Sequence, residues 1–370
     1  MTGDRKTVVF AGGGTGGHLY PGLAIARTLV RIDPTVHPFF IGAMRGIERT
    51  VLPKTEFPHL LLDLHPLYRA KVWENWRTLR GAIGAWRELG ALVATERPRA
   101  VVGTGGYAAG VALAYAVVHH IPIVQQAGDS YPGLTARAFR RWTREYYLAF
   151  PEASKILGGS PDQHVDTGAP IEPPPAPRPD RAAARRAWKF PEHGGTVLLI
   201  YGGSQGSRAM NLVVAEWVKR GLPTDLYLIW MTGSASYTEF ASLESDRVRV
   251  REYLAPISDA YAATDLALTR AGAMTTAELF AWTIPAILVP LPTAAADHQS
   301  VNARTLEAAG AAITLVQSEL TVDRLQQAVA TLIQDPAAMQ KLAAGAAARA
   351  RPDAAEVIAR RILRLIGSTV

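Results

Sequence analysis

A glycine-rich segment near the start of the chain, Gly12-Gly13-Gly14-Thr15-Gly16-Gly17-His18, constrains the fold more than any other feature. A short apolar run precedes it, and Pro21 followed by apolar residues at helical spacing comes after it. A glycine loop between a buried strand and a helix presents backbone N–H groups beside a helix N-terminus, where a diphosphate binds well. A histidine on such a loop can take a proton from an attacking hydroxyl group. The segment therefore predicts phosphate recognition and a candidate general base, His18.

The same segment fits the G-x-G-x-x-G pattern of dinucleotide-binding proteins through Gly12, Gly14 and Gly17. An NAD site also needs an acidic residue near the end of the second strand, to hold the ribose. The second apolar run, residues 36–42, is followed by Ala43 and Met44 without a carboxylate. We therefore do not expect a dehydrogenase, and a purely structural glycine turn remains the simpler alternative.

Composition narrows the class of protein and its partners. A chain of 370 residues, 48% hydrophobic and 19% charged, suits two globular domains. It has no cysteine, which excludes disulfides and thiolate metal sites. The net charge of +7 points to nucleic acid, anionic lipid or a phosphorylated substrate, and no RNA-binding motif favours the first. No apolar run of membrane-spanning length and no secretory segment is evident, so we expect a cytoplasmic location.

A helical pattern between residues 69 and 87 combines tryptophans with cations. Its apolar positions recur at three- and four-residue spacing: Val72, Trp76, Leu79, Ile83 and Trp86. Trp73 and five cations accompany them: Arg69, Lys71, Arg77, Arg80 and Arg87. The pattern fits either a core-facing helix or an interfacial helix with tryptophans at headgroup depth and arginines on anionic lipid.

Apolar runs alternate with helical patterns along the chain, which predicts an α/β fold with parallel sheets. The expected strands are 7–12, 36–42, 59–64, 100–105, 121–126, 146–150, 196–203, 226–233, 248–254, 266–272, 285–292 and 311–316. We expect an N-terminal Rossmann-like domain (1–168), a proline-rich linker (169–182), a C-terminal Rossmann-like domain (183–350) and a closing helix (351–370) that packs back on the first domain.

The second half of the chain begins as the first half does. A second glycine loop, Gly202-Gly203-Ser204-Gln205-Gly206, follows the apolar run 197–201. Two Rossmann-like domains, each with such a loop at the carboxyl ends of its strands, predict the GT-B architecture, with both sheets facing a central cleft.

Several motifs occur in order along residues 7–316: the first glycine loop with 21–24 (PGLA), then 103–107 (GTGGY), 132–135 (PGLT), 202–208 (GGSQGSR) with Asn211, 270–278 (RAGAMTTAE), and 297–299 (DHQ) with 302–303 (NA). Together they resemble the MurG family of UDP-N-acetylglucosamine transferases. Such a series is far more specific than any single glycine motif.

The resemblance implies an inverting transfer of N-acetylglucosamine from its UDP donor to an undecaprenyl-diphosphate-linked N-acetylmuramoyl-pentapeptide, in peptidoglycan synthesis and hence in cell shape and division. It implies a peripheral protein on the cytoplasmic side of the cell membrane, with no cofactor and no nucleic acid partner. The chain has no D-x-D sequence, so we expect no carboxylate-held metal.

The resemblance also implies roles for single residues. His18 would be the base, with Thr15, Gly16 and Gly17 near the substrate diphosphate. Ser204 would hold the donor phosphates, the backbone of Leu254 the uracil, Glu278 the ribose and Gln299 the sugar hydroxyls. The remaining expected substrate-binding residues are Asp129, Ala273, Met274, Thr275, Thr276 and Ala277.

Two positions depart from the family pattern. Asp129 stands where the family has a sugar-contacting asparagine, and Glu172 stands where it has an arginine near the donor phosphate. Both changes leave other functions open. One alternative is a related transferase with another lipid acceptor, such as a diacylglycerol. The other is a UDP-sugar-binding protein without turnover.

Overall fold

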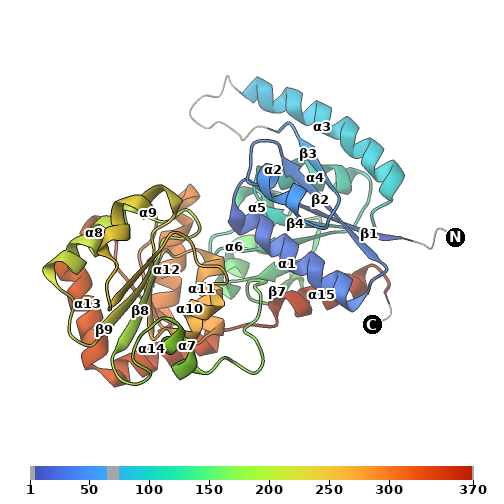
Figure 1. The fold of residues 1–370 in the computed structure, drawn as a ribbon. Helices are drawn as coiled ribbons and strands as arrows, with labels where there is room; N and C mark the ends of the chain where they lie inside the picture. Colours follow the sequence, from blue (N-terminus) through green and yellow to red (C-terminus); the bar gives the residue numbers. More distant parts are fainter. Residues whose placement is uncertain (1–4, 65–74, 369–370) are drawn as a thin grey trace. The chain divides into compact units, whose positions relative to one another are not determined.

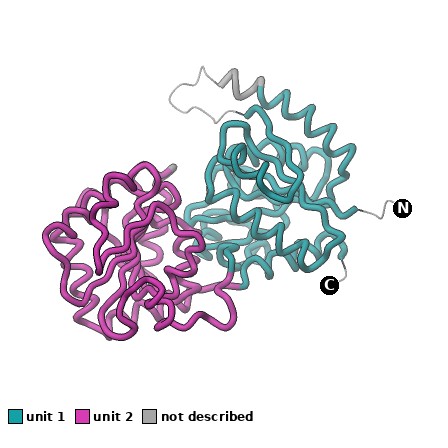
Figure 2. Tube along the Cα trace, viewed as in Figure 1, with its two compact units in different colours: residues 1–172, 353–370 teal, residues 173–352 magenta. Residues whose placement is uncertain are grey.

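The structure is a computed structural model that describes residues 5–64 and 75–368, the side chains of residues 75–80 and of Ala295 excepted. The chain divides into two compact units (Figure 2). Unit 1 comprises Met1–Glu172 and Asp353–Val370, and unit 2 comprises Pro173–Pro352. Each unit contains one parallel sheet covered by helices (Figure 1), as the sequence predicts for an α/β fold.

The sheet of unit 1 has seven strands in the order β3-β2-β1-β4-β5-β6-β7. The strands are β1 (Lys6–Gly12), β2 (Val36–Ala43), β3 (His59–Leu62), β4 (Ala100–Gly105), β5 (Ile123–Ala127), β6 (Thr143–Leu148) and β7 (His164–Asp166). The strand order reverses between β1 and β4, so the loops that follow these two strands lie side by side at the carboxyl edge. Such a switch point is where α/β sheets bind ligands.

Both faces of this sheet are buried, because consecutive residues of β1 enter different cores. Val8 and Phe10 pack with α1 and α15, whereas Val9 and Ala11 pack with α3 and α4. Figure 1 shows α1 and α15 side by side. The helices are α1 (Gly16–Ile32), α2 (Glu48–Val51), α3 (Asn75–Glu96), α4 (Tyr107–Val118), α5 (Leu134–Ala138), α6 (Ser154–Leu157) and α15 (Ala354–Leu365).

The sheet of unit 2 has six strands in the order β10-β9-β8-β11-β12-β13, with the reversal between β8 and β11. The strands are β8 (Thr196–Tyr201), β9 (Leu226–Met231), β10 (Val248–Arg251), β11 (Leu266–Thr269), β12 (Ala286–Leu288) and β13 (Ala312–Thr314). The helices are α7 (Arg181–Ala187), α8 (Arg208–Arg220), α9 (Ser234–Phe240), α10 (Ser258–Ala263), α11 (Ala273–Ala281), α12 (His298–Ala308), α13 (Val322–Gln334) and α14 (Pro336–Arg349).

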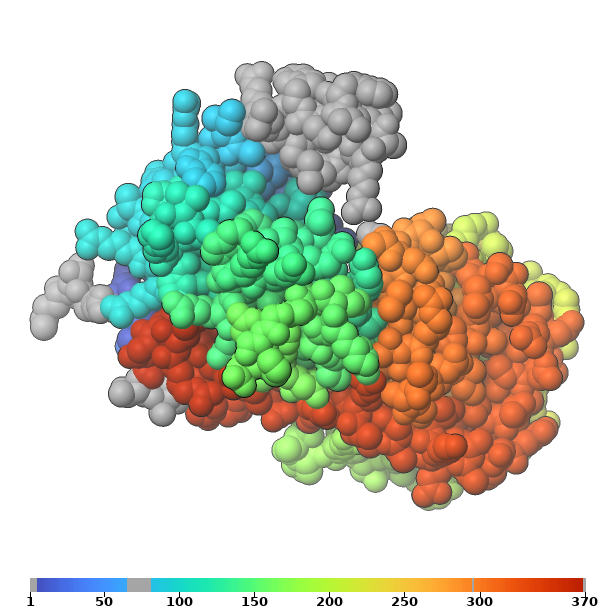
Figure 3. Space-filling view, turned by 180° about the vertical axis from the view of Figure 1, so that it is seen from behind, coloured from blue at the N-terminus to red at the C-terminus, as the bar shows by residue number. Residues whose placement is uncertain are grey.

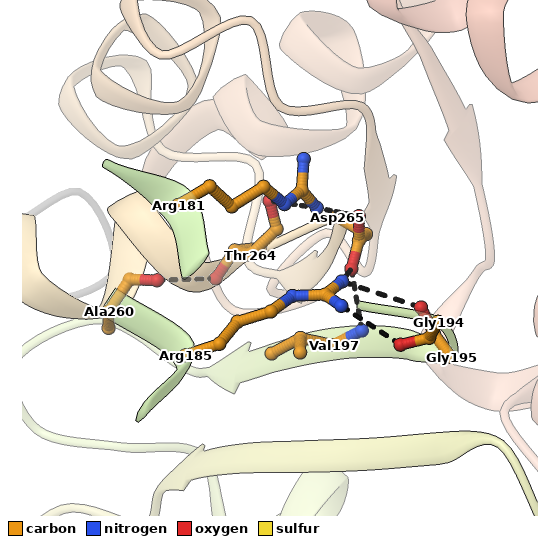
Figure 4. A network of polar contacts seen from close by, with 8 residues as sticks. All are labelled: Arg181, Arg185, Gly194, Gly195, Val197, Ala260, Thr264 and Asp265. Atoms are coloured by element: carbon orange, nitrogen blue, oxygen red, sulfur yellow. Dashed lines mark hydrogen bonds and ion pairs between the residues drawn. The ribbon is translucent and has the colours of Figure 1, made fainter. Parts of the chain in front are cut away.

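An ionic network ties α7 to the amino-terminal edge of this sheet (Figure 4). The Asp265 carboxylate accepts from the backbone N–H of Val197 at 2.8 Å and pairs with Arg181 and Arg185. Arg185 is buried and also donates to the carbonyl oxygens of Gly194 and Gly195. Burial lowers the pKa of Arg185. The network joins the first helix of unit 2 to strands β8 and β11.

All twelve predicted strands are present, with ends that differ by a few residues. Strand β6 begins at Thr143, earlier than its apolar run, and the three-residue edge strand β7 is absent from the prediction. Both differences have one cause, because polar residues near a sheet edge carry no apolar signal.

The tryptophan-rich helical pattern falls partly within the described residues. On α3, Ala85 and Leu89 are the buried side chains, whereas Ile83 is 54% exposed and Trp86 is 36% exposed. The predicted stripe is therefore displaced from the face that packs on the core. Trp73, Val72 and the cations Arg69 and Lys71 lie outside the described residues, as do the side chains of Trp76, Arg77, Leu79 and Arg80. No helix in the described part of the chain is both long and apolar enough to cross a membrane.

Candidate active site

Two glycine loops of unit 1 meet in backbone contact. Gly12 ends β1, and α1 begins at Gly16. The N–H of Gly13 donates to the carbonyl oxygen of Gly105, the last residue of β4, at 3.2 Å. A Cβ atom on Gly106 would lie 2.0 Å from the carbonyl oxygen of Gly13, so only glycine allows this approach. Two motifs some ninety residues apart thereby form one surface at the switch point.

His18 is oriented by the loop from which it emerges. Its Nδ1 atom lies 3.1 Å from the carbonyl oxygen of Gly13 and 3.3 Å from Oγ1 of Thr15. A carbonyl oxygen only accepts, so this contact requires the proton on Nδ1, and the neutral ring then carries its lone pair on Nε2. A Cβ atom on Gly105 would lie 2.7 Å from the imidazole, which therefore packs on the second loop. In that tautomer Nε2 is the ring nitrogen that can accept a proton.

The third motif of unit 1 supports the second loop. Thr135, at the start of α5, donates through Oγ1 to the carbonyl oxygen of Gly106 at 3.0 Å. Tyr107 opens α4, and its ring lies 3.3 Å from the position of a Cβ on Gly14. Asp129 lies half-buried in the connection between β5 and α5. The structure thus joins three of the predicted segments through direct contacts.

The N-terminus of α1 suits an anion. Thr15 caps the helix without a side-chain hydrogen bond, and the first turn contains no acidic residue. Gly16 and Gly17, which begin the helix, carry no side chain to cover their N–H groups. The predicted diphosphate contacts of Thr15, Gly16 and Gly17 are therefore compatible with the geometry.

Glu48 braces this loop and was not predicted from the sequence. It is fully buried, and its Oε1 accepts from the N–H of Gly14 at 2.9 Å and of Ala43 at 3.2 Å. A Cβ atom on Gly13 or Gly46 would lie 1.6 or 2.0 Å from its carboxylate oxygens. The one sequence signal was the pair Gly42 and Gly46 around the end of β2, which makes room for the carboxylate.

In unit 2 the third glycine loop joins β8 to α8. Ser204 is exposed on it, as a phosphate contact requires. The loop closes tightly, because the N–H of Gly206 donates to the carbonyl oxygen of Gly203 at 2.9 Å and both residues have positive φ. A Cβ atom on Gly206 would lie 2.0 Å from the carbonyl oxygen of Thr232, so the loop packs directly on the end of β9.

Arg270 fastens this loop to the neighbouring strands. Its buried guanidinium donates to Oγ of Ser207 and to Oε1 of Gln317, both at 2.6 Å, and to the carbonyl oxygens of Val289 and Pro290. Burial lowers the pKa of Arg270. The first residue of the predicted motif 270–278 therefore has a structural role, which its position in the motif did not reveal.

Helix α11 carries the largest group of predicted donor residues. Its first turns contain Ala273, Met274, Thr275, Thr276 and Ala277. The Thr276 side chain is buried and donates to the carbonyl oxygens of Gly272 and Ala273, so it is turned toward its own helix. The first turn contains no acidic residue, and Glu278 follows in the second turn. Glu278 is therefore not an acid of the helix N-terminus.

Leu254 lies in the connection between β10 and α10, and Gln299 lies in the first turn of α12. Leu254 is buried beside Tyr253, which is 58% exposed. Oε1 of Gln299 accepts from the N–H of Leu291 at 3.0 Å, which leaves the amide NH2 group as the donor.

Two motif residues hold the scaffold instead. Asn211 is buried, with Nδ2 donating to the carbonyl oxygen of Thr232 at 2.8 Å and Oδ1 accepting from Nε1 of Trp230 at 3.0 Å. Asn302 is fully buried, and its Nδ2 donates to the carbonyl oxygen of Ala271 at 3.2 Å. Both amides tie a helix to the end of a strand.

Glu172 lies exposed at the end of the first segment of unit 1. Its charge acts on Arg27 of α1. The pKa of Arg27 is raised, first by the hydrogen bond to Glu56 and in smaller part by the charge of Glu172.

Comparison with known proteins covers nearly the whole chain. Residues 8–148 match the glycosyltransferase family 28 N-terminal domain, and residues 197–358 match the corresponding C-terminal domain. A protein of Salinibacter ruber named UDP-N-acetylglucosamine--N-acetylmuramyl-(pentapeptide) pyrophosphoryl-undecaprenol N-acetylglucosamine transferase is 37% identical, over 99% of this chain and 98% of its own length. A protein of Moorella thermoacetica with the same name is 35% identical, over 98% and 99%.

Among solved structures, the crystal structure of Acinetobacter baumannii MurG is similar, with a TM-score of 0.75 and 26% identity over 97% of this chain and 99% of that one. The similarity spans both Rossmann-like units, as the GT-B prediction requires.

Proposed function

Because this chain belongs to glycosyltransferase family 28, we propose that it transfers N-acetylglucosamine from UDP-N-acetylglucosamine to an undecaprenyl-diphosphate-linked N-acetylmuramoyl-pentapeptide. The observation that carries the proposal is the full-length match to relatives of that name, at 35–37% identity. The product would be a β-linked disaccharide, formed by a single displacement at the anomeric carbon of an α-linked donor.

In this reaction His18 acts as the general base. With the proton of Nδ1 directed at the Gly13 carbonyl, Nε2 can accept the proton of the attacking sugar hydroxyl. The imidazolium that forms keeps the same hydrogen bond to Gly13. The N-terminus of α1, with Thr15, Gly16 and Gly17, holds the diphosphate of the acceptor beside this base.

Residues of unit 2 bind the donor. Ser204 and the backbone amides of its loop hold the donor diphosphate and stabilise the charge of the departing UDP, together with the N-terminus of α8. The backbone of Leu254 contacts uracil, and Glu278 accepts from the ribose hydroxyls. The amide NH2 of Gln299 donates to hydroxyl oxygens of N-acetylglucosamine.

The acceptor requires the enzyme to reach a membrane surface, and unit 1 exposes suitable side chains. On α3, Ile83 and Trp86 are exposed beside the exposed cation Arg87. The Trp86 ring packs on the ring of Tyr115 in α4, with 4.9 Å between the ring centroids. Helix α4 in turn contacts α5. Beyond α5, Trp142 is 53% exposed among further exposed cations: Arg140, Arg141 and Arg144.

These helices present their outer surface on one side of unit 1 (Figure 3, cyan to green). Exposed aromatic and aliphatic side chains among arginines are typical of a protein that binds anionic lipid from the water side. The proposed location is therefore the cytoplasmic side of the cell membrane, with attachment through this surface of unit 1.

The function is tested by measuring UDP release from UDP-N-acetylglucosamine with two acceptors. Release with a lipid I analogue, and not with diacylglycerol, supports the proposal. Release with diacylglycerol alone assigns the chain to a related lipid glycosyltransferase. Tight binding of UDP-N-acetylglucosamine without release in either case makes it a sugar-nucleotide-binding protein, the outcome to which Asp129 and Glu172 would then contribute.

A further inference from the structure

The carboxylate proposed to bind ribose is held by two phenols. Tyr261 of α10 donates its hydroxyl to Oε2 of Glu278 at 2.8 Å. The hydroxyl oxygen of Tyr201, at the end of β8, lies 3.1 Å from that of Tyr261. A phenol has one proton to give. Because Tyr261 gives its proton to the carboxylate, Tyr201 must be the donor to Tyr261.

Both phenols are buried, Tyr201 with 3% and Tyr261 with 4% of its surface exposed. Burial raises the pKa of each phenol, and the negative charge of Glu278 raises it further. Both phenols therefore stay protonated at neutral pH. With Glu278 ionised, the direction of donation is from Tyr201 to Tyr261 to Glu278.

The ring of Tyr261 is also confined. Its ring centroid lies 6.5 Å from that of Tyr201 and 5.9 Å from that of Trp282. These neighbouring rings restrict the movement of the hydroxyl group that donates to Glu278. Glu278 itself is half-buried and lies on α11. Its carboxylate is thus oriented by groups of two other elements, β8 and α10.

We propose that Tyr261, supported by Tyr201, is a positioning residue that fixes the carboxylate of Glu278 for the vicinal hydroxyls of a ribose. The inference rests on the proposed assignment of Glu278 to the donor ribose. Two neighbouring hydroxyls need a carboxylate whose plane is already set, because a freely rotating glutamate loses rotamer entropy on binding. Tyr261 therefore contributes to affinity for UDP and to the preference for UDP over 2′-deoxy-UDP, without touching either nucleotide.

The test measures dissociation constants of UDP and 2′-deoxy-UDP by calorimetry, with the melting temperature of each variant. The immobilisation of one side chain corresponds to a change of about three- to tenfold in binding. Tyr261→Phe should therefore weaken the binding of UDP by that factor and reduce the preference for UDP over 2′-deoxy-UDP. Tyr201→Phe, which acts only through Tyr261, should weaken UDP by about twofold. The kcat at saturating donor should stay within about twofold of wild type, because the chemistry is not touched.

Tyr227→Phe is the matched control, because it also removes a phenolic oxygen from unit 2. Tyr227 lies near the amino end of β9, whereas Tyr201 lies at the carboxyl end of β8. Suppose that Glu278→Ala weakens UDP binding, whereas Tyr261→Phe binds UDP as tightly as Tyr227→Phe does. The assignment of Glu278 to the ribose then stands, and the positioning role of Tyr261 is overturned. If Glu278→Ala binds UDP as wild type does, the ribose assignment fails and the positioning role fails with it. In the Glu278→Ala background, Tyr261→Phe should have no further effect on UDP. If Tyr261→Phe lowers UDP affinity as much in the Glu278→Ala background as in wild type, Tyr261 acts on a group other than Glu278, which also overturns the inference.

Discussion

Replacing Glu48 tests whether the first glycine loop depends on the buried carboxylate beneath it. One oxygen, Oε1, accepts from two backbone N–H groups, the buried one of Ala43 and the partly buried one of Gly14. The other, Oε2, has no hydrogen-bond partner among the described residues. Glu48→Gln keeps an acceptor for both N–H groups and replaces only Oε2, whereas Glu48→Ala leaves both donors without a partner.

The two variants should differ strongly. A hydrogen bond to a charged group contributes about 1.5–3 kcal/mol and one to a neutral group about 0.5–1.5 kcal/mol, so glutamine loses about 2 kcal/mol over two bonds. The lower cost of burying a neutral amide offsets part of that loss. Alanine leaves both donors unsatisfied, at about 1–3 kcal/mol for each fully buried donor. Because the N–H of Gly14 is only partly buried, about 2–6 kcal/mol is the upper range for the two together. This is a large fraction of the 5–15 kcal/mol by which a domain is typically stable.

The assay is the kcat for transfer together with the dissociation constant of UDP, at a temperature where each variant is folded. Glu48→Gln should keep kcat within about threefold, and Glu48→Ala should lower it by about 10- to 100-fold, because the loop that orients His18 is released. UDP affinity should not change, since the proposed UDP contacts belong to unit 2. Glu56→Ala, which removes an exposed glutamate of the same unit, is the control. A folded Glu48→Ala enzyme with wild-type kcat would refute the reasoning.

Three further predictions concern stability, the donor site and the membrane. Hydrogen bonds from Thr35 above all, and then from Lys6 and Ser368, lower the pKa of Asp33, so its stabilisation is present above the ordinary carboxyl pKa of about 3.9 and is lost as the pH falls below it. Asp33→Asn should therefore lower the free energy of unfolding at pH 7 by about 1–2 kcal/mol and the melting temperature by a few degrees. The difference in stability from wild type should shrink below about pH 3, and a constant difference at all pH values would contradict this prediction. Glu172→Ala should leave UDP-N-acetylglucosamine affinity within about threefold, because an exposed charge screened by solvent contributes little, and a large gain would show that the carboxylate faces the phosphate. Ile83→Ser should weaken salt-sensitive binding to phosphatidylglycerol vesicles by about threefold or more, since it removes an exposed aliphatic side chain, whereas Leu212→Ser, at an exposed leucine of unit 2, should not; equal effects would argue against the unit 1 surface.

The sequence predicted the fold class and the family because the signals it needed are local. Apolar runs such as Ala100–Gly105 coincide with a strand, and the glycine loops mark where strands turn into helices. The family comparison confirms the predicted resemblance, and the transferase activity follows from it.

The supporting residues could not be predicted in the same way, because they act across long distances in the sequence. Glu48 reaches Gly14 from 34 positions away, and Tyr201 reaches Tyr261 from 60 positions away. Apart from Gly42 and Gly46 near Glu48, nothing in the local pattern separates them from an ordinary helical glutamate or a core tyrosine. Conversely, Asn211 belongs to a diagnostic motif but holds the end of β9, so membership of a motif did not identify contact with a ligand.

The most direct test of the account is the transfer of labelled N-acetylglucosamine to a lipid I analogue by wild type and by His18→Ala, with UDP affinity measured in parallel. A positioned base contributes about 10²- to 10⁴-fold to the rate. Wild type should form the labelled disaccharide, and His18→Ala should lose turnover by that factor while binding UDP as tightly. Unchanged turnover in His18→Ala would contradict the assignment of the base, and absence of transfer by a wild-type protein that binds UDP-N-acetylglucosamine would contradict the proposed function.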